Sequence, residues 1–345
     1  MPYTVVDLPT EYFNTKLYTG TGSAQSITGV GFQPDWVWIK DRTSANNHRL
    51  LDIVRGATKE LYSSTTDAET TQTQSLTAFN SDGFSIGTLA QINTNANNYV
   101  SWNWLASNTS GSSNTSGSIT STVSANTTSG FSIVSWAGNQ TAGASCGHGL
   151  GVVPKMIIKR RRNGDGADNW YVYTSTTGNS NSLYLDITSG SAASGAWNSQ
   201  TPTSTVFYHG SSIRENGNNM IAYCFAEVKG FSKFGSYTGN GSTDGTFVYT
   251  GFKPAFVLMK SSSTVENWHI FDDARNTFNP ADKDLRPNLQ NAETTSSVSN
   301  IDFLSNGFKL RNSDADYNGS GTTYIYMAFA ENPFVSSTGI PTTAR

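Results

Sequence analysis

The sequence has few charged residues and almost no cysteine. Only 14% of its 345 residues are charged, against roughly 25% in an average soluble protein, and the net charge is −3. This balance gives no basic footprint for nucleic acid or for an anionic membrane surface. The only cysteines, Cys146 and Cys224, could form one disulfide, but two cysteines do not make a disulfide framework. Buried thiols that pack in the core are the simpler interpretation.

Long apolar runs and helical periodicity are also missing. No run approaches the roughly 20 residues that cross a bilayer, so no membrane insertion is expected. Residues 1–9 contain no basic region followed by an apolar one, which argues against a signal peptide and predicts synthesis as a soluble cytoplasmic product. No window keeps apolar residues at helical spacing for long, so the chain is predicted to be all-β.

One sequence pattern occurs three times in the chain. Its copies occupy residues 31–40, 150–159 and 251–260. Each copy is a turn closed by proline, then one residue, then an apolar run that ends in lysine. Proline fixes φ and has no N–H, so it belongs where a strand begins. The seed prolines lie 120 and 100 residues apart, which is long enough for each copy to bury its own core.

These copies predict three tandem homologous antiparallel β-sandwich repeats of jelly-roll type. The predicted division is an N-terminal arm (1–11), repeats at 12–107, 118–229 and 230–334, a Gly/Ser/Asn linker (108–117) and a C-terminal tail (335–345). A linker of that composition is flexible, so the first repeat is expected to be hinged, and the second and third to be rigidly joined.

Short apolar runs between Gly and Asn clusters predict the strands of the first repeat. They fall at residues 16–19, 25–27, 35–40, 49–53, 76–79, 84–86 and 99–105, with one helical turn at 57–62. The closing strand of the third repeat, 324–330, is apolar on alternate and intervening residues alike. A strand of that kind is covered on both faces, by its partner sheet and by a neighbouring repeat or subunit.

Four tryptophans of the first repeat are candidates for ligand binding. Trp36 and Trp38, and likewise Trp102 and Trp104, are two residues apart, which places each pair on one face of a strand. Such a stripe packs a core, or it lines a sugar site or a subunit interface. A glycan site, if present, is expected here.

Asp314, Asp316 and Asn318 offer oxygen ligands at alternate positions before a glycine, like the start of a calcium loop. The pattern fails at its twelfth position, where Ile325 replaces the bidentate glutamate. A turn held by Asp and Asn side chains is the alternative. Calcium is therefore the one cofactor to consider.

Catalytic signatures are weak. Asp272 and Asp273 are adjacent carboxylates, but nothing in the sequence makes them converge on a cleft, as glycoside hydrolysis requires. The histidines stand apart at no metal-ligand spacing, and Cys146 and His148 lie in a glycine-rich loop. The basic run 160–162 is expected to be a solvated loop. We predict no enzyme activity, with a glycan-degrading enzyme as the remote alternative.

The chain resembles the repeat-containing virion structural proteins of marine bacteriophages, including cyanophages. The matching stretches are 18–23, 31–40, 118–126, 147–152, 222–228, 233–242, 302–310 and 324–334. The resemblance covers nearly the whole chain. It implies lectin-like β-sandwich modules placed in tail fibres, tail appendages or the head surface, and it brings no catalytic residues.

That resemblance implies a virion protein of the tail with a host-surface glycan attachment role. Expected partners are other virion proteins, further copies of this chain in a trimer, and host polysaccharide. The alternative is a head-surface decoration or cement protein, because three repeats in one chain mimic a trimer and would suit a site of three-fold symmetry.

Overall fold

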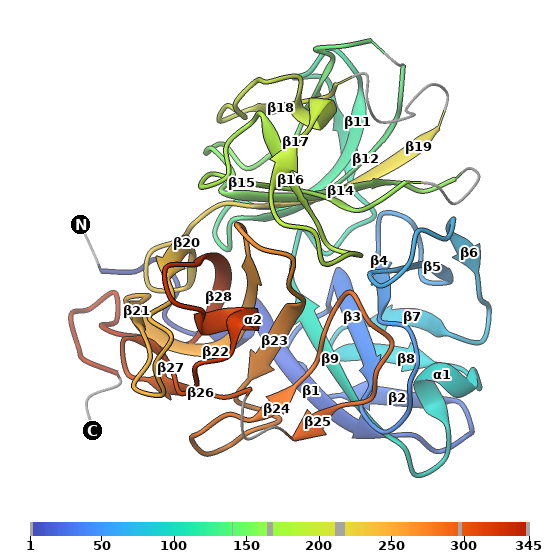
Figure 1. Cartoon of the computed structure of the whole chain (residues 1–345). Coiled ribbons are helices and arrows are strands. Elements are labelled where there is room, and N and C mark those ends of the chain that lie inside the picture. Colours follow the sequence, from blue (N-terminus) through green and yellow to red (C-terminus); the bar gives the residue numbers. More distant parts are fainter. Residues whose placement is uncertain (1–2, 140, 164–167, 211–217, 296–298, 343–345) are drawn as a thin grey trace.

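The computed structural model describes residues 3–139, 141–163, 168–210, 218–295 and 299–342. Strands account for 43% of the chain and helices for 4%, which confirms the all-β prediction. We refer to residues 12–107, 118–229 and 230–334 as the first, second and third segments. Figure 1 shows the second segment at the top, the third at lower left and the first at lower right.

The first segment consists of two antiparallel sheets. The larger sheet has the order β1 (Phe13–Thr19), β9 (Asn98–Trp104), β3 (Trp36–Asp41), β4 (Arg49–Asp52), β5 (Lys59–Tyr62) and β6 (Thr70–Thr71). The smaller sheet has the order β2 (Gln25–Thr28), β8 (Gly83–Ile86) and β7 (Leu76–Asn80), and α1 (Ala90–Asn93) precedes β9. Most predicted strands are therefore confirmed, but residues 57–62 contain strand β5 instead of the predicted helical turn.

The second segment has one long sheet and one short sheet. The long sheet has the order β10 (Ser112–Asn114), β11 (Ser121–Asn126), β12 (Phe131–Ala137), β19 (Asn219–Phe225), β14 (Met156–Arg161), β15 (Tyr171–Thr174), β16 (Asn181–Tyr184) and β17 (Ala192–Ala193). The short sheet pairs β13 (Ser145–Gly147) with β18 (Val206–Tyr208). Strand β10 lies inside the predicted flexible linker, where its backbone pairs with β11 and extends the sheet.

The third segment also has a larger and a smaller sheet. Its larger sheet has the order β20 (Ser232–Thr238), β28 (Thr323–Pro333), β22 (Phe252–Ser261) and β23 (Trp268–Asp272). The smaller sheet has the order β21 (Phe247–Tyr249), β27 (Gly307–Leu310) and β26 (Ile301–Leu304). A further hairpin joins β24 (Lys283–Asp284) to β25 (Thr294–Thr295), and α2 (Ala315–Asn318) precedes β28.

The strand that carries the apolar run of each seed copy occupies the same place in its segment. β3, β14 and β22 each lie between the closing strand of their segment (β9, β19 or β28) and the strand that follows them in sequence (β4, β15 or β23). Pro34 and Pro154 precede their strands as predicted, but Pro254 lies inside β22, at an irregularity in its pairing with β28, which a bulge permits. All six residues of β3 and of β14 are buried.

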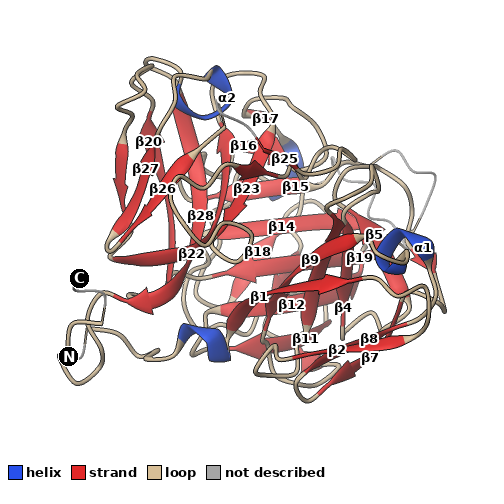
Figure 2. Ribbon diagram, turned by 90° about the horizontal axis from the view of Figure 1, so that it is seen from below, coloured by secondary structure: helices blue, strands red, loops and turns tan. Residues whose placement is uncertain are grey.

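One hydrophobic core lies between the three larger sheets and draws on all three segments. Trp104, Phe225 and Phe329, which stand at matching places in the three closing strands, meet there. Three further cores lie inside the segments, between the larger and smaller sheets. Each larger sheet is thus covered on both faces, as the closing-strand pattern predicted, and a neighbouring segment of the same chain supplies the second cover (Figure 2).

Hydrogen bonds join the segments in a closed ring. The backbone N–H of Glu69 donates to the Arg162 carbonyl at 2.6 Å. The backbone N–H of Ser191 donates to the Ser262 carbonyl at 2.8 Å, and that of Glu293 to the Arg42 carbonyl at 2.9 Å. The first segment therefore touches the second, the second touches the third, and the third returns to the first.

The first segment is consequently not hinged on a flexible linker, because its tryptophans form part of the shared core. The basic run is not a solvated loop either. Arg160 is 1% exposed and donates to the backbone carbonyls of Tyr62 and Thr65. Arg162 forms an ion pair with Glu69 at 2.9 Å, so this run joins the first two segments.

Candidate functional site

The four tryptophans proposed for glycan binding lie in the shared core. Trp36, Trp38, Trp102 and Trp104 are each 1% exposed or less. Trp36 stacks on Tyr223 of the second segment with ring centroids 4.2 Å apart. The indole Nε1 of Trp102 donates to Asp272 of the third segment at 3.0 Å. A sugar cannot reach these rings, so the glycan-site hypothesis is wrong for them and core packing is their role.

The three residues proposed for calcium do not converge. Asp314 caps α2 by accepting a hydrogen bond from the Asp316 N–H at 2.9 Å. The Asp316 carboxylate is hydrogen-bonded to His269 Nε2 at 3.1 Å. The Asn318 amide is buried and donates to the carbonyls of Ser242 and Asn312. No group of three His, Cys, Asp or Glu suited to a metal occurs in the described residues. The turn alternative therefore holds here.

The thiols and the catalytic pair suggested by Cys146 and His148 are also structural. Neither cysteine is part of a disulfide, both are buried, and burial raises the pKa of Cys224. His148 is buried, and its Nδ1 accepts from the Leu150 N–H at 3.2 Å. Burial lowers the pKa of His148. Cys146 and His148 are both fully buried, whereas reactive cysteines occupy partially exposed surroundings.

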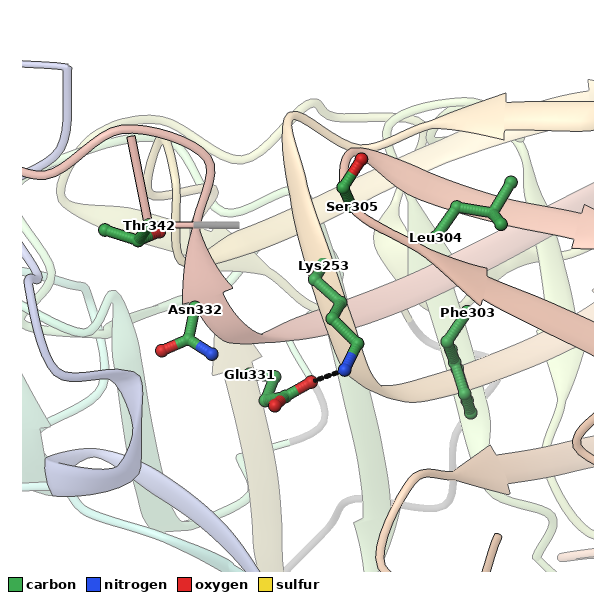
Figure 3. Close-up of a pocket in the computed structure, with 7 residues that line it drawn as sticks. All are labelled: Lys253, Phe303, Leu304, Ser305, Glu331, Asn332 and Thr342. Carbon is green, nitrogen blue, oxygen red and sulfur yellow. Dashed lines mark ion pairs between the residues drawn. The ribbon is translucent and has the colours of Figure 1, made fainter. Parts of the chain in front are cut away.

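An open groove lies along one end of the third segment, close to both chain termini. Its largest part has a volume of about 400 Å³ and is lined by Lys253, Phe303, Leu304, Ser305, Glu331, Asn332 and Thr342 (Figure 3). Cavities of about 220 Å³ and 110 Å³ adjoin it through shared residues. Lys253 and Phe303 also line the first of these, and Glu331 also lines the second. Asp273 lines both smaller cavities and so connects them.

A β-bulge aims the charged residues into the groove. In the pairing of β22 with β28, Lys253 lies opposite Asn332 and Pro254 lies opposite Ala330, so Glu331 has no opposite residue. Bulges of this kind redirect a side chain and occur frequently beside functional sites. The corresponding pairs β3–β9 and β14–β19 have continuous register. Lys253 and Glu331 form an ion pair, with side chains 37% and 34% exposed.

Asp273 makes the groove less charged than its composition suggests. Burial, followed by the negative charges of Glu331 and Asp272, raises the pKa of Asp273 to about 8. Like charges in one site disfavour ionisation, so the proton stays on Asp273 at neutral pH. A perturbed carboxyl in a groove is a functional-site signal. At neutral pH the groove therefore holds one cation, one anion and one neutral acid.

Lys253 and Asp273 have no counterparts in the other segments, whereas Glu331 has one in Glu227 of the second segment. The residue before the seed proline is Lys253 in the third segment, and Gln33 or Val153 elsewhere. Asp273 follows the last residue of β23, where Ile53 and Ser175 follow β4 and β15. Glu331 corresponds to Ala106 and Glu227, and Glu227 pairs instead with Lys233. The groove chemistry therefore belongs to the third segment alone.

Large exposed aromatic side chains also gather in the third segment. Phe278 lines the cavity of about 220 Å³ and is 85% exposed. Phe247 and Tyr249 point outward from β21 and are 44% and 57% exposed. The residues at their register positions in the first two segments are small (Ser26, Thr28, Ser145 and Gly147).

The comparisons with known proteins agree with one continuous unit. A family model described as a domain of unknown function, DUF7483, matches residues 8–333. The chain belongs to the DUF7483 family. No curated protein and no solved structure shows a significant match to this DUF7483 chain. In the described residues, no helix is long and apolar enough to span a membrane.

Sequence reasoning named Asp273 but missed Lys253, Glu331, Phe247, Tyr249 and Phe278 as site residues. A usable signal was present in the three seed copies, which share the proline and an apolar run after it but differ at the residue before the proline (33, 153 and 253). Repeated residues mark shared structure, so a binding site specific to one segment is expected where the copies disagree. The number of aromatic residues pointed instead to the first segment, where the rings are buried.

Proposed function

We propose that this chain is a structural protein of a bacteriophage virion, placed in a tail fibre or tail appendage, and that it attaches the particle to polysaccharide on the host surface. The observation that carries the attachment role is the groove of the third segment. It combines hydrogen-bonding groups (Lys253, Glu331, Asn332) with apolar side chains in an open cavity of about 400 Å³. Ligand sites commonly have this composition and size. The virion placement rests on the resemblance to marine phage proteins.

We further infer that the three segments are copies of one β-sandwich unit with a lectin-like role. Two observations support this inference. The larger sheets share one strand order, and equivalent hydrogen bonds recur at the interfaces. For example, the indole Nε1 groups of Trp170 and Trp268 donate to the carbonyls of Tyr62 and Tyr184, both at 2.7 Å. His48, which stands at the equivalent position immediately before β4, interacts with the backbone of Arg286.

A second candidate is a head-surface decoration or cement protein, either as a single chain or as a trimer. The ring of contacts from Glu69, Ser191 and Glu293 favours it, because a body with approximate three-fold symmetry fits a three-fold position on a shell. This role needs no ligand groove. The third-segment differences around Lys253 therefore favour attachment over decoration.

Two measurements on the intact particle test the proposal. Gold-labelled antibodies against the chain are expected to mark the tail in electron micrographs. Added purified protein is expected to compete with particles for adsorption to host cells, and periodate oxidation of the cell surface is expected to abolish that competition. If the label is spread over the head and the purified protein does not compete for host cells, the decoration role replaces the attachment role. Absence of label from purified particles would remove both virion roles.

A further inference from the structure

We propose that the third-segment groove binds one neutral sugar unit of a polysaccharide through two adjacent hydroxyl groups, which Glu331 and Lys253 hold. The inference rests on the proposed attachment function and names the ligand class. Sugar hydroxyls both donate and accept hydrogen bonds, so a site for a diol needs an acceptor next to a donor. The Lys253–Glu331 ion pair places a carboxylate beside an ammonium at the cavity wall (Figure 3).

Both members of the pair retain capacity for a ligand. A carboxylate has two oxygens with about four lone-pair sites, and an ammonium has three donors. Their mutual contact occupies only part of this capacity, and both side chains are about one-third exposed. The Oε2 atom of Glu331, which pairs with Lys253, is buried. The other oxygen, Oε1, can accept from two neighbouring hydroxyls while Lys253 donates to one of their oxygens. Asn332 and Ser305 add polar groups to the same cavity.

The charge balance selects a neutral sugar over an acidic one. The charges of Lys253 and Glu331 compensate each other. Asp273 is the third group, and it is uncharged at neutral pH because burial and the charge of Glu331 raise its pKa to about 8. A sugar carboxylate or sulfate would bring a second negative charge beside Glu331 and would compete with it for Lys253. A neutral hexose meets neither cost.

The apolar part of the groove suits a sugar ring within a chain. Leu304 and the edge of the Phe303 ring, which is only 5% exposed, line the main cavity beside the ion pair, where C–H groups of a sugar can contact them. Phe303 also lines the adjoining cavity of about 220 Å³, together with the exposed ring of Phe278. A second sugar unit can therefore pack against Phe278 while the first occupies the main cavity.

The test uses the full-length protein and a panel of methyl glycosides. Methyl α-D-glucopyranoside, methyl α-D-galactopyranoside and methyl α-D-mannopyranoside supply neutral diols of different geometry. Methyl α-D-glucopyranosiduronate supplies the acidic counterpart. Binding is measured by saturation-transfer NMR and by titration calorimetry. The variants are Glu331→Gln and Lys253→Met in the groove. Glu227→Gln is the matched control, because it removes a similarly exposed carboxylate from a lysine pair (Glu227–Lys233) in the second segment.

At least one neutral glycoside is expected to bind, and its Kd is expected to rise about tenfold or more in Glu331→Gln and Lys253→Met, because each loses hydrogen bonds to a charged group. Glu227→Gln is expected to bind as the wild type does. Tighter binding of the uronate, or equal binding by all variants, would overturn the inference.

The attachment role and the groove assignment can fail separately. If Glu331→Gln still competes for host cells, and periodate still abolishes that competition, the attachment role stands and the assignment of the groove as its site is wrong. Glycoside binding lost in Glu331→Gln, without any competition for cells, would keep the groove as a sugar site and remove attachment. Melting curves of each variant exclude misfolding as the cause of lost binding.

Discussion

Asp272 in the third segment accepts a hydrogen bond from the indole Nε1 of Trp102 in the first segment at 3.0 Å. The same oxygen pairs with Arg275 Nε at 2.6 Å. Asp52 repeats this arrangement between the first and second segments. It pairs with Arg55 Nε at 2.5 Å and accepts from the Tyr223 hydroxyl at 2.8 Å. In each case a buried ion pair holds an aromatic side chain of the next segment.

Replacing Arg275 by methionine is expected to destabilise the whole protein by about 3–5 kcal/mol, because it leaves the Asp272 carboxylate buried without its cation. Urea unfolding followed by tryptophan fluorescence measures this loss. Lys233→Met is the control, since it breaks an ion pair that is partly exposed and is expected to cost about 1 kcal/mol or less. Equal losses in the two variants would show that Asp272–Arg275 is not an important joint.

The protein is expected to unfold in one cooperative transition, because one core joins all three segments. Trp104→Ala is expected to lower the free energy of this single unfolding transition by about 3–5 kcal/mol, because it leaves a large cavity in the core. Differential scanning calorimetry gives the number of transitions and the ratio of van't Hoff to calorimetric enthalpy. A separate early transition of the first segment would mean that this segment is hinged after all.

His269 is expected to stabilise the fold at neutral and acidic pH and to lose that contribution in alkali. Burial alone would lower its pKa, but the carboxylates of Asp284 and Asp316 outweigh burial and raise the pKa to about 9. The folded pKa exceeds the unfolded value of about 6.5. The contribution, about 3 kcal/mol, is therefore complete below about pH 6.5 and is lost as pH rises through about 9.

The His269 contribution is measured as a difference between proteins, because Lys40 and Lys260 also titrate in this range. Burial lowers the pKa of both lysines to about 8. Unfolding free energies of the wild type and of His269→Gln are compared from pH 6 to pH 10. The gap between them is expected to shrink as pH rises. A gap that stays constant would exclude a charged His269 in the folded state.

Asp273→Asn is expected to stabilise the protein above about pH 8 and to have little effect near pH 4. The folded pKa of Asp273, which burial and Glu331 raise to about 8, exceeds its unfolded value of about 3.9. The folded state therefore disfavours the ionised form, and wild-type stability falls as pH rises from about 4 to about 8. Removing the carboxyl is expected to restore up to about 5 kcal/mol at pH 9. Thermal melts at both pH values measure the difference.

Calcium is expected to leave the melting temperature unchanged. The Asn318 Oδ1, the atom that would bind a cation, accepts from the Asn240 N–H at 3.1 Å, and Asp316 pairs with His269, so a cation at this turn would have to break existing bonds. Melting curves with excess calcium and with a chelator check this. A calcium-dependent rise that Asp314→Asn abolishes would restore the calcium loop.

Much of the local structure was predictable from the residues. Seed prolines, apolar runs and Gly/Asn turns marked the strands of the first segment to within a few residues, because strand boundaries depend on neighbouring residues. The failures at 57–62 and 108–117 have a common cause. Residues such as Lys59–Tyr62 and Ser112–Asn114 have little strand signal of their own and become strands by pairing with a sheet edge that is already present.

The sequence by itself determined the all-β class, the three seeds and the two-sided cover of the closing strands, since each follows from local residue types and their alternation. Only the tertiary structure decided that the three larger sheets share one core. The sequence around Trp36 would look the same whether its ring packed in a shared core or lay on an open surface that binds sugar. What covers its ring depends on Tyr223, which is far away in sequence. The groove is equally non-local, because a bulge in β28 and the ends of β22 and β23 must meet before Lys253, Asp273 and Glu331 face one cavity system.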